Sequence, residues 1–568
     1  MRWTVIDNEP SRNFPIYCRG NTGEVYPNVM TPLTGSLVLR AAQRGQEAVI
    51  VDLGFLSPSH LDDGDGAITG VFGGYLYGNV SMTRVAAARA PGMTVGDIDT
   101  QMFGLSDAPP YVARPDDRSV RCTLRLGRKT ATGLLRPDRA LVERDRQSAA
   151  AWIASLPAID GADDAQLIDV ASQLPPKFEE MMAHLLFVSA YAGISRSLLE
   201  KLTDGLGDPS LVNHLTVGLG TIESAEPAFA LWALGRHVAC SAALASEFDR
   251  GVHGLRDRLG DVDPSFAVEL DRFLAAFGSR GPDEWELASP TWGTDPAIAL
   301  AAIDRLRNAP DERDPTRTSK RLAAGRADAI AKTAARLPRH RRAIFRRVLD
   351  TTALYAAMRE ATKATFVRCL EPARRVLHEL ARRHDLEPSE LFLLTFDELD
   401  QFVRSPASFS AVLDERRAKR DFLQARVPPF WFDGALPDPD TWQRRGTRHE
   451  VNSEARTMRG MGVCPGIATG AARIVTDPSE PGELQPGDIL VAPLTDPAWT
   501  PLFLAVAGVV VDVGAQQSHA AIIARELGIP AVVSVTGASN TIANGTLITV
   551  DGDAGTVTVH AGDDVGRL

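Results

Sequence analysis

A histidine at the expected start of a helix is the residue in this sequence best placed for group transfer. A buried strand at 508–513 runs into a Gly-containing turn, Ser518 can cap the next helix, and the helix His519–Leu527 ends at Gly528. His519 would then lie beside the free N–H groups and the positive dipole end of that helix, which favour a bound anion. An imidazole placed there can attack phosphorus and hold the resulting phosphoramidate. On this segment alone, a histidine that only caps a helix is the simpler interpretation.

Three charged residues in one expected helix form a second candidate set. Arg359 and Lys363 are four residues apart in a helix predicted over 349–370, so their side chains face the same way. Two cations on one face repel each other, and a phosphate between them would relieve that repulsion. Glu360 lies beside them and could take the proton of an acceptor hydroxyl. From spacing alone, a solvated helix face with a Glu360–Lys363 ion pair is the preferred interpretation.

The elements that must position these residues fall into several units. At about 100–200 residues per domain, a chain of 568 residues predicts several domains. Short apolar runs between Gly and Asp turns, such as 48–53 and 70–82, predict strands, whereas apolar residues at three- and four-residue spacing predict helices from about 137 to 425. The predicted fold class is α+β and multidomain. The boundaries are 1–115 for an N-terminal β-containing part, 116–425 for a large helical domain, 426–460 for a Pro- and Arg-rich linker, and 461–562 for an α/β domain.

Four motifs follow one another in the last hundred residues. They are Gly462-x-x-Pro465-Gly466-x-Ala468, Gly487-Asp488-Ile489-Leu490-Val491, Thr495-Asp496-Pro497-x-Trp499-Thr500-Pro501-Leu502 and Ser518-His519-Ala520-Ala521-Ile522-Ile523. In this order they resemble the swivelling phosphohistidine domain shared by phosphoenolpyruvate (PEP) synthase, pyruvate phosphate dikinase and the rifampin phosphotransferases. The resemblance implies that His519 is phosphorylated and carries phosphate between two distant sites. Two positions depart from the family pattern, because Gly514-Ala515 replaces a Gly-Gly pair and Gln517 stands where a small or hydroxyl residue is common.

Shorter motifs occur along residues 1–450. They are Asn28-Val29-Met30-Thr31-Pro32-Leu33-Thr34, Tyr77-x-Asn79-Val80-Ser81, Pro91-Gly92-Met93, Gly278-Ser279-Arg280-Gly281-Pro282-Asp283-Glu284-Trp285-Glu286, Arg359-Glu360-x-x-Lys363 and the stretch 391–399. Together they resemble the acceptor-binding domain of the same rifampin phosphotransferase family. The resemblance implies that Arg359, Glu360 and Lys363 lie at the phosphotransfer centre, opposite His519, and that all four are catalytic.

A Gly- and Pro-containing loop supplies further binding candidates. Loops commonly carry binding residues, and this loop, residues 278–286, contains Arg280, Glu284 and Glu286. Together with Ser518 and Asn79 they form the predicted phosphate- or substrate-binding set. Structural salt bridging of Arg280 is the alternative. Ser279 replaces a histidine frequent in relatives, which puts a proton-transfer role at that position in doubt. The loop Val217-Gly218-Leu219-Gly220 is better explained as a helix junction than as a phosphate cradle.

Composition narrows the functional class. Asp and Glu (72) outnumber Lys and Arg (61), and a net charge of −11 argues against a general nucleic-acid binder. The five cysteines are scattered, which predicts reduced thiols and neither a disulfide framework nor a metal site. No secretory signal is visible at the N-terminus, and the apolar run 502–511 is about half as long as a membrane span requires. We therefore expect a cytoplasmic protein without a membrane or nucleic-acid partner.

The nucleotide-handling module that such a carrier requires has no counterpart in the sequence. No G-x-x-x-x-G-K-[ST] loop occurs, and residues 520–568 are too few for a PEP- or pyruvate-handling barrel, which needs about 250 residues. We therefore expect ATP and Mg²⁺ to be bound by a separate ATP-grasp-type subunit that charges His519. Six arginines within 336–347 form either a solvated helix face or a docking patch for such a partner.

These features together predict an ATP-dependent, dikinase-type phosphotransferase. Phosphate would pass from a nucleotide on the partner subunit to His519 and then to a hydroxyl or enolate-type oxygen of a small acceptor in the helical domain. A phosphorylation-driven dehydratase or condensing enzyme with transient phosphate is one alternative. A non-catalytic phosphocarrier or regulatory protein is the other, and the motif does not name the acceptor.

Overall fold

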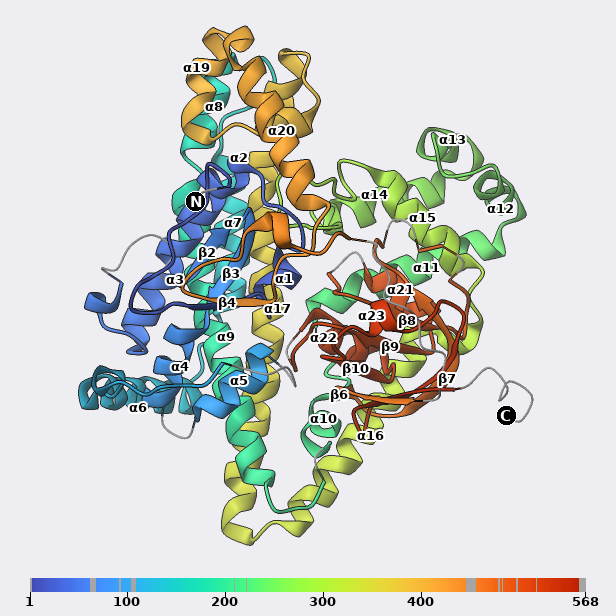
Figure 1. Cartoon of the computed structure of the whole chain (residues 1–568). Helices are drawn as coiled ribbons and strands as arrows, with labels where there is room; N and C mark the ends of the chain where they lie inside the picture. Colours follow the sequence, from blue (N-terminus) through green and yellow to red (C-terminus); the bar gives the residue numbers. More distant parts are fainter. Residues whose placement is uncertain are drawn as a thin grey trace.

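The structure is a computed structural model in which a large helical body lies beside a C-terminal unit built on a sheet (Figure 1). It describes residues 3–560 except for 62–67, 91–92, 104–108, 209, 221, 446–455, 479–480, 483, 497–498 and 517. Three sequence features therefore fall outside the described residues: Pro91-Gly92, Pro497 and Gln517.

The N-terminal part is built on a four-stranded antiparallel sheet in the order β2-β3-β1-β4. Its strands are β1 (Ile16–Cys18), β2 (Thr69–Phe72), β3 (Tyr75–Asn79) and β4 (Trp431–Asp433). Strand β4 lies inside the predicted linker 426–460, so the first part of that segment is folded onto this sheet and is not an extended connection. Residues 446–455 are outside the described residues, and residues from Arg456 onward join the C-terminal sheet.

Of two stretches predicted as strands, one is helical and the other forms strands only as far as Asn79. Residues 48–53 form the end of α3 (Arg40–Leu53), and the predicted strand 70–82 stops at Asn79, where α4 (Val80–Arg89) begins. The β-branched residues of 48–53 favour a strand, but tertiary packing overrides that preference. Gly45 lets α3 approach the backbone of α9, since a Cβ there would lie 2.2 Å from the Glu179 carbonyl oxygen.

Two long helices, α9 (Pro175–Thr203) and α17 (Arg339–Arg383), pack along each other through the centre of the molecule. Their contact buries apolar side chains that recur at helical spacing. The other helices of the body are α1 (Thr22–Val25), α2 (Pro32–Thr34), α5 (Val95–Phe103), α6 (Val120–Leu135), α7 (Leu141–Ser155), α8 (Asp164–Ser172), α10 (Leu211–Thr216), α11 (Glu226–Cys240), α12 (Ala242–Asp249), α13 (Leu255–Val262), α14 (Pro264–Phe277), α15 (Pro296–Arg307), α16 (Pro315–Arg336), α18 (Pro388–Leu391), α19 (Leu399–Arg404) and α20 (Ser410–Gln424).

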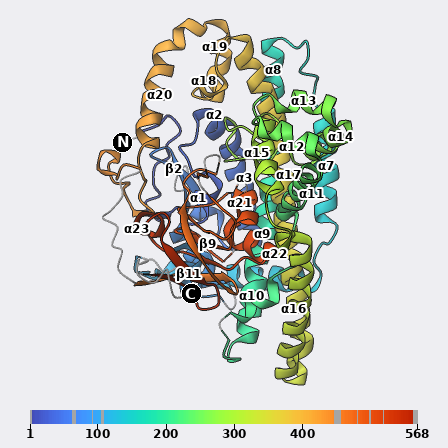
Figure 2. The ribbon, with the colours of Figure 1, turned by 90° about the vertical axis from the view of Figure 1, so that its right-hand side faces the viewer.

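The C-terminal unit contains a mixed sheet in the order β5-β12-β11-β7-β8-β9-β10-β6. Strands β7 to β10 run parallel in the middle of it, and the remaining pairs are antiparallel. Helix α22 follows β9 and lies on the side of the unit that faces α9 and α17 (Figures 1 and 2). The elements are β5 (Arg456–Arg459), β6 (Met461–Cys464), β7 (Ile467–Ile474), β8 (Ile489–Ala492), α21 (Thr500–Ala505), β9 (Gly508–Val511), α22 (His519–Leu527), β10 (Ala531–Val533), α23 (Ala538–Thr541), β11 (Leu547–Asp551) and β12 (Thr556–Val559).

One apolar core runs across the boundary between the two bodies. Side chains of α11–α15, among them Leu231, Trp232 and Phe273, belong to the same buried cluster as Phe503 and Ile523 of the C-terminal unit. A second core joins the N-terminal part to α9 and α17. The C-terminal unit therefore shares its core with the upper helices and meets α9, α10 and α17 on another side (Figure 1).

Among the described residues, one helical stretch, Asp164–Thr203, has the length and apolarity to cross a membrane. Half of its most apolar window is buried inside the protein, as in a core helix. A second candidate combines Glu223–Cys240 with Ala242–Asp249, which are bent by 105°.

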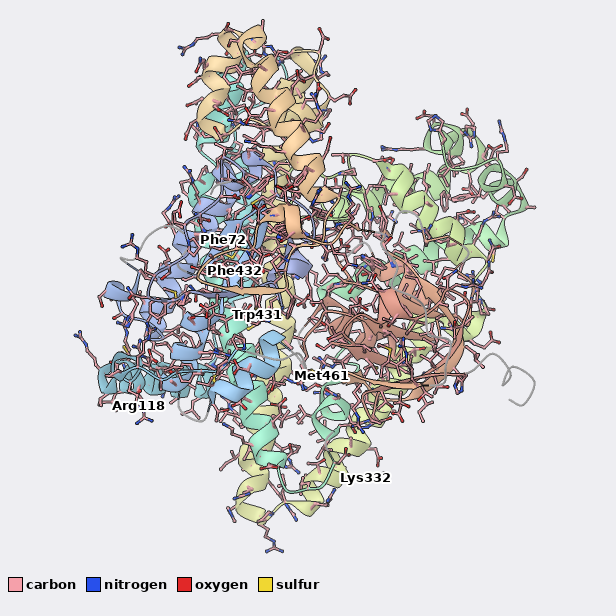
Figure 3. All side chains as sticks on the ribbon, viewed as in Figure 1. Phe72, Arg118, Lys332, Trp431, Phe432 and Met461 are labelled. Carbon is pink, nitrogen blue, oxygen red and sulfur yellow. The ribbon has the colours of Figure 1, made fainter. Side chains whose placement is uncertain are left out.

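An aromatic contact attaches β4 to the first sheet and yields a prediction. The rings of Phe72 and Phe432 lie 5.1 Å apart, both are buried, and Figure 3 labels them side by side. Replacing Phe432 with Ala should lower the free energy of unfolding of this part by about 3–5 kcal/mol, because a large ring leaves a cavity. Urea unfolding followed by tryptophan fluorescence measures the loss. Asp433→Ala, on the exposed face of the same strand, is the control, and equal stability of both variants would contradict this account.

Candidate functional site

A strand, a short loop and a helix place His519 at the carboxyl end of the parallel strands, where open α/β sheets commonly bind ligands. Ser518 has extended backbone, and its Oγ accepts the Ala521 N–H at 3.2 Å, which caps α22. Gly528 ends the helix in the left-handed conformation, with φ 64°. The predicted helix His519–Leu527 and both of its caps are confirmed.

The imidazole of His519 is buried. Its Nε2 lies 3.4 Å from Thr500 Oγ1, and Phe503 meets the ring edge-on. Burial lowers the pKa of His519 well below its usual value, and the nearby cations Lys363, Arg280 and Arg359 lower it further. A neutral imidazole keeps a nitrogen lone pair at neutral pH, so this side chain is available as a nucleophile.

His519 opens onto a cavity of about 450 Å³ between the two bodies. Arg359, Glu360 and Lys363 of α17 line the same cavity, so the four predicted catalytic residues come together from positions far apart in the sequence. The remaining wall is largely apolar, and Figure 3 labels one of its residues, Met461, at the edge of the C-terminal unit. The apolar side chains that line the cavity are Val25, Tyr26, Val38, Leu39, Ala42, Leu76, Met182, Leu185, Leu186, Trp285, Phe366, Met461, Ala515 and Ile522.

The charged residues of α17 do not pair as the spacing suggested. Arg359 Nη1 lies 3.1 Å from Glu360 Oε1, whereas Lys363 Nζ lies 3.9 Å from Glu284 Oε1. Glu360 is buried and its carboxylate contacts the neighbouring guanidinium, not Lys363. A solvated face with a Glu360–Lys363 pair is therefore not what the structure contains.

The predicted loop residues divide into two groups. Arg280 and Glu284 are both buried and form a 2.6 Å ion pair, and Glu284 also faces Lys363. They lie behind the cationic face of α17, and neither is among the described residues that line the cavity. In this position Glu284 partly compensates the charge of two cations and holds them near His519.

Glu286 and Asn79 have contacts typical of structural residues. Glu286 Oε1 accepts from the hydroxyls of Thr31 and Thr34 at 2.7 and 2.5 Å, and its Oε2 accepts the Thr31 N–H at 3.0 Å. Asn79 caps α4 by accepting the Met82 N–H and donates to the Phe14 carbonyl. Neither is among the described residues that line the cavity.

One cavity residue escaped the sequence analysis. Glu24, in the short helix α1, lies half-buried beside His519, and its Oε2 accepts the His519 backbone N–H at 3.1 Å. Burial raises the pKa of Glu24 to about 8. No spacing could link it to a histidine 495 residues away, and a four-residue helix carries no periodic pattern. Its only sequence signal was the polar stretch Asn21-Thr22-Gly23-Glu24 after a short apolar run.

Polar contacts attach the carrier helix to the helical body. Asn213 Oδ1 accepts from Arg196 Nη2 at 2.9 Å and from Arg525 Nη2 at 3.3 Å, and its Nδ2 donates to the Gly462 carbonyl at 2.9 Å. Arg196 Nε also donates to Gln516 Oε1 at 2.7 Å, in the loop before His519. Asn213 thus bridges both bodies at the base of α22.

The two-glycine loop at 217–220 makes a second contact of this kind. The N–H groups of Leu219 and Gly220 both donate to the Glu526 carboxylate at 3.1 Å. Gly218 and Gly220 have φ values of 58° and 72°, which turn the successive N–H groups toward the carboxylate. The loop joins two helices, as expected, and its N–H groups bind an anionic side chain of the C-terminal unit.

Comparison with known proteins agrees with these two units. Residues 484–555, which contain His519, match the family described as "PEP-utilising enzyme, mobile domain". Residues 184–360, which contain most of α9 and end at Glu360, match "Rifampicin phosphotransferase fourth domain".

Curated relatives match over most of the chain. A rifampicin phosphotransferase of Streptomyces sviceus is 28% identical over 82% of this chain and 54% of its own length. The prodigiosin synthesizing transferase PigC of Serratia marcescens is 31% identical over 64% of this chain and 42% of its own length. An uncharacterized protein of Mycobacterium tuberculosis is 27% identical over 98% of this chain and 62% of its own length. The chain thus spans 42–62% of the length of these relatives.

The Asn213 bridge yields a prediction about docking. Asn213→Leu removes an acceptor from two buried guanidinium groups and a donor from the Gly462 carbonyl, a loss of about 1–3 kcal/mol for the docked position. Backbone amides of α22 should therefore exchange with deuterium faster than in the wild type. The matched control is Asn308→Leu, an exposed asparagine after α15. Unchanged protection of α22 in the Asn213 variant would contradict a role in docking.

Proposed function

We propose that this chain, which carries the mobile domain of the PEP-utilising enzymes behind a segment matching the fourth domain of rifampicin phosphotransferase, transfers a phosphoryl group from His519 to an oxygen of a bound acceptor. One observation carries the proposal: the neutral imidazole of His519 shares a cavity with the cations of α17. The chain is thus a dikinase-type, ATP-dependent phosphotransferase that works through phosphohistidine.

The charges around the cavity suit a phosphoryl group in transit. Lys363 and Arg359 supply positive charge opposite His519, and the N-terminus of α22 adds a partial positive charge. The acceptor oxygen attacks phosphorus, the N–P bond breaks, and its electron pair returns to the imidazole. Because the ring is neutral again after transfer, it is ready for another phosphoryl group. The buried cavity limits the access of water, which would otherwise hydrolyse the phosphohistidine.

Charging of His519 requires a different position of the C-terminal unit. In the docked position His519 is only 6% exposed, so a nucleotide bound elsewhere cannot reach its ring. We assign ATP and Mg²⁺ to an ATP-grasp-type partner subunit, and the segment 446–455 connects the carrier unit to β4. This assignment rests on the sequence expectation above and not on the geometry of the cavity.

A second candidate function uses phosphate only transiently. Phosphorylation would turn an acceptor oxygen into a leaving group for dehydration or condensation. The likeness to a protein named as a prodigiosin synthesizing transferase favours this variant. A stable phosphate ester in the products supports simple phosphotransfer, and water loss without an ester supports the variant.

Loading of His519 and transfer from it can be tested without the partner. Treatment with phosphoramidate, a chemical phosphoryl donor, should place acid-labile phosphate on His519 of the wild type and none there in His519→Ala. Mixing the loaded protein with methanol, as a minimal hydroxyl acceptor, should give methyl phosphate. Arg359→Ala and Lys363→Ala should each slow this transfer by about 10²–10³-fold, because they remove charge that stabilises the transition state.

The control for that experiment is Arg368→Ala, a half-exposed cation further along α17. Phosphate release and methyl phosphate are both measured by ³¹P NMR. Loaded Arg359 and Lys363 variants that transfer at the wild-type rate would instead favour a non-catalytic phosphocarrier whose helical body binds a partner.

The assignment of ATP to a partner has its own test. The purified chain, incubated with Mg²⁺ and ATP labelled at the β or the γ position, should take up no label on His519. The phosphoramidate-loaded chain is the positive control for detection. Label on His519 from ATP alone would place a nucleotide site in this chain and exclude the separate subunit.

A further inference from the structure

Glu24 is a half-buried carboxyl group that forms no ion pair among the described residues. Its side chain lies in the wall of the cavity, and the described part of the chain offers it a hydrogen bond from the His519 N–H but no ion pair. A carboxylate that loses hydration without gaining an ion pair is costly, even with Lys363 and Arg359 close enough to lower its pKa, so its position needs an explanation other than stability. Perturbed acids in clefts are frequent at reacting centres.

Two other acids near His519 are engaged differently. Glu360 contacts Arg359 at 3.1 Å, and Glu284 pairs with Arg280 at 2.6 Å and faces Lys363. Both carboxylates therefore compensate the cations that would hold a phosphoryl group. Removing a proton from an acceptor with either of them would weaken that compensation during transfer.

We propose that Glu24 is a further catalytic residue of the transfer, the base that takes the proton of the acceptor hydroxyl. The inference deepens the proposed function and rests on it. The geometry supports it because Glu24 approaches His519 from α1, opposite the cations of α17, and a hydroxyl in the cavity can meet both phosphorus and this carboxylate.

The step balances as a simple displacement. The acceptor oxygen forms a bond to phosphorus, the N–P bond breaks, and its electron pair returns to the imidazole. The other ring nitrogen keeps its proton throughout and the hydroxyl proton moves to a Glu24 oxygen, so the products are a phosphate ester, neutral His519 and protonated Glu24. The proton returns to solvent when the cavity opens for product release.

The surroundings of Glu24 set the pH at which it can act. Burial raises its pKa to about 8 and Glu360 raises it further, whereas the His519 N–H, Lys363 and Arg359 lower it. On the other walls of the cavity the charged groups are Asp97, Arg196 and Glu200. Because the pKa is raised, the carboxyl group is protonated below about pH 8 and becomes a base above it. Transfer should therefore speed up as the pH rises through that value.

The test compares Glu24→Gln with Glu360→Gln in single turnovers. The full-length chain is loaded with phosphoramidate, freed of reagent and mixed with methanol at pH values below and above about 8. Gln at position 24 keeps a carbonyl oxygen for the His519 N–H but cannot take a proton. We expect Glu24→Gln to transfer about 10²–10⁴-fold more slowly and without the rise. Glu360→Gln should be slower but keep the rise.

The outcomes separate this inference from the proposed function. A wild-type chain that never carries phosphate on His519 refutes the proposed function itself. A loaded Glu24→Gln chain that transfers at the wild-type rate, with the wild-type increase in rate with pH, refutes only the role of Glu24. The same conclusion follows if Glu360→Gln loses the increase in rate with pH and Glu24→Gln keeps it. If Glu24→Gln does not fold, Glu24→Asp decides: a slower transfer with a displaced pH rise supports the role, and an unchanged profile overturns it.

Discussion

The burial of the His519 imidazole beside the cations of α17 is the constraint on which the arrangement of this protein depends. Burial and the nearby cations Lys363, Arg280 and Arg359 hold the pKa of His519 well below its usual value, which favours the neutral imidazole. The same positive charges favour a phosphoryl group once it is attached to the ring. One electrostatic environment thus prepares the nucleophile and stabilises its anionic product, and this requires that two bodies of the chain bury the ring jointly.

Local sequence signals predicted the part of the site that local interactions determine. Ser518, Gly528 and the apolar spacing between them define α22, so position and caps of the carrier helix followed directly from the residues. Arg359 and Lys363 lie on one helix and face one cavity, which their spacing anticipated. That these residues face His519 came from the family resemblance, since no pattern in a single sequence encodes that contact.

The predictions that differed from the structure depended on tertiary contacts. Residues 48–53 are rich in β-branched side chains, yet they end a helix that packs closely against α9 through Gly45. Residues rich in Pro and Arg suggested a linker, but Phe432 inserts into an aromatic cluster and turns its segment into a strand. The contacts of Glu24 with His519 and of Asn213 with Gly462 join residues hundreds of positions apart, so no local rule identifies them.

Two kinds of contact attach the C-terminal unit to the rest of the chain. Toward α9 and α10 the contacts are polar, through Asn213, Arg196 and the Glu526 carboxylate. Water can replace such groups with little net loss, which makes this side of the boundary separable. Toward α11–α15 the contact is an apolar core.

The apolar core shared with α11–α15 determines which helices can move together with the C-terminal sheet. Separating α11–α15 from the sheet would expose apolar surface, at a cost of about 25 cal/mol per Å². A rotation that takes these helices along leaves that surface covered and breaks only the polar side. The hinges of such a motion then fall near the start of α11 and within α16, outside the matched range 484–555 of the mobile domain. His519 would then move as part of a larger body that comprises the C-terminal unit and helices α11–α15.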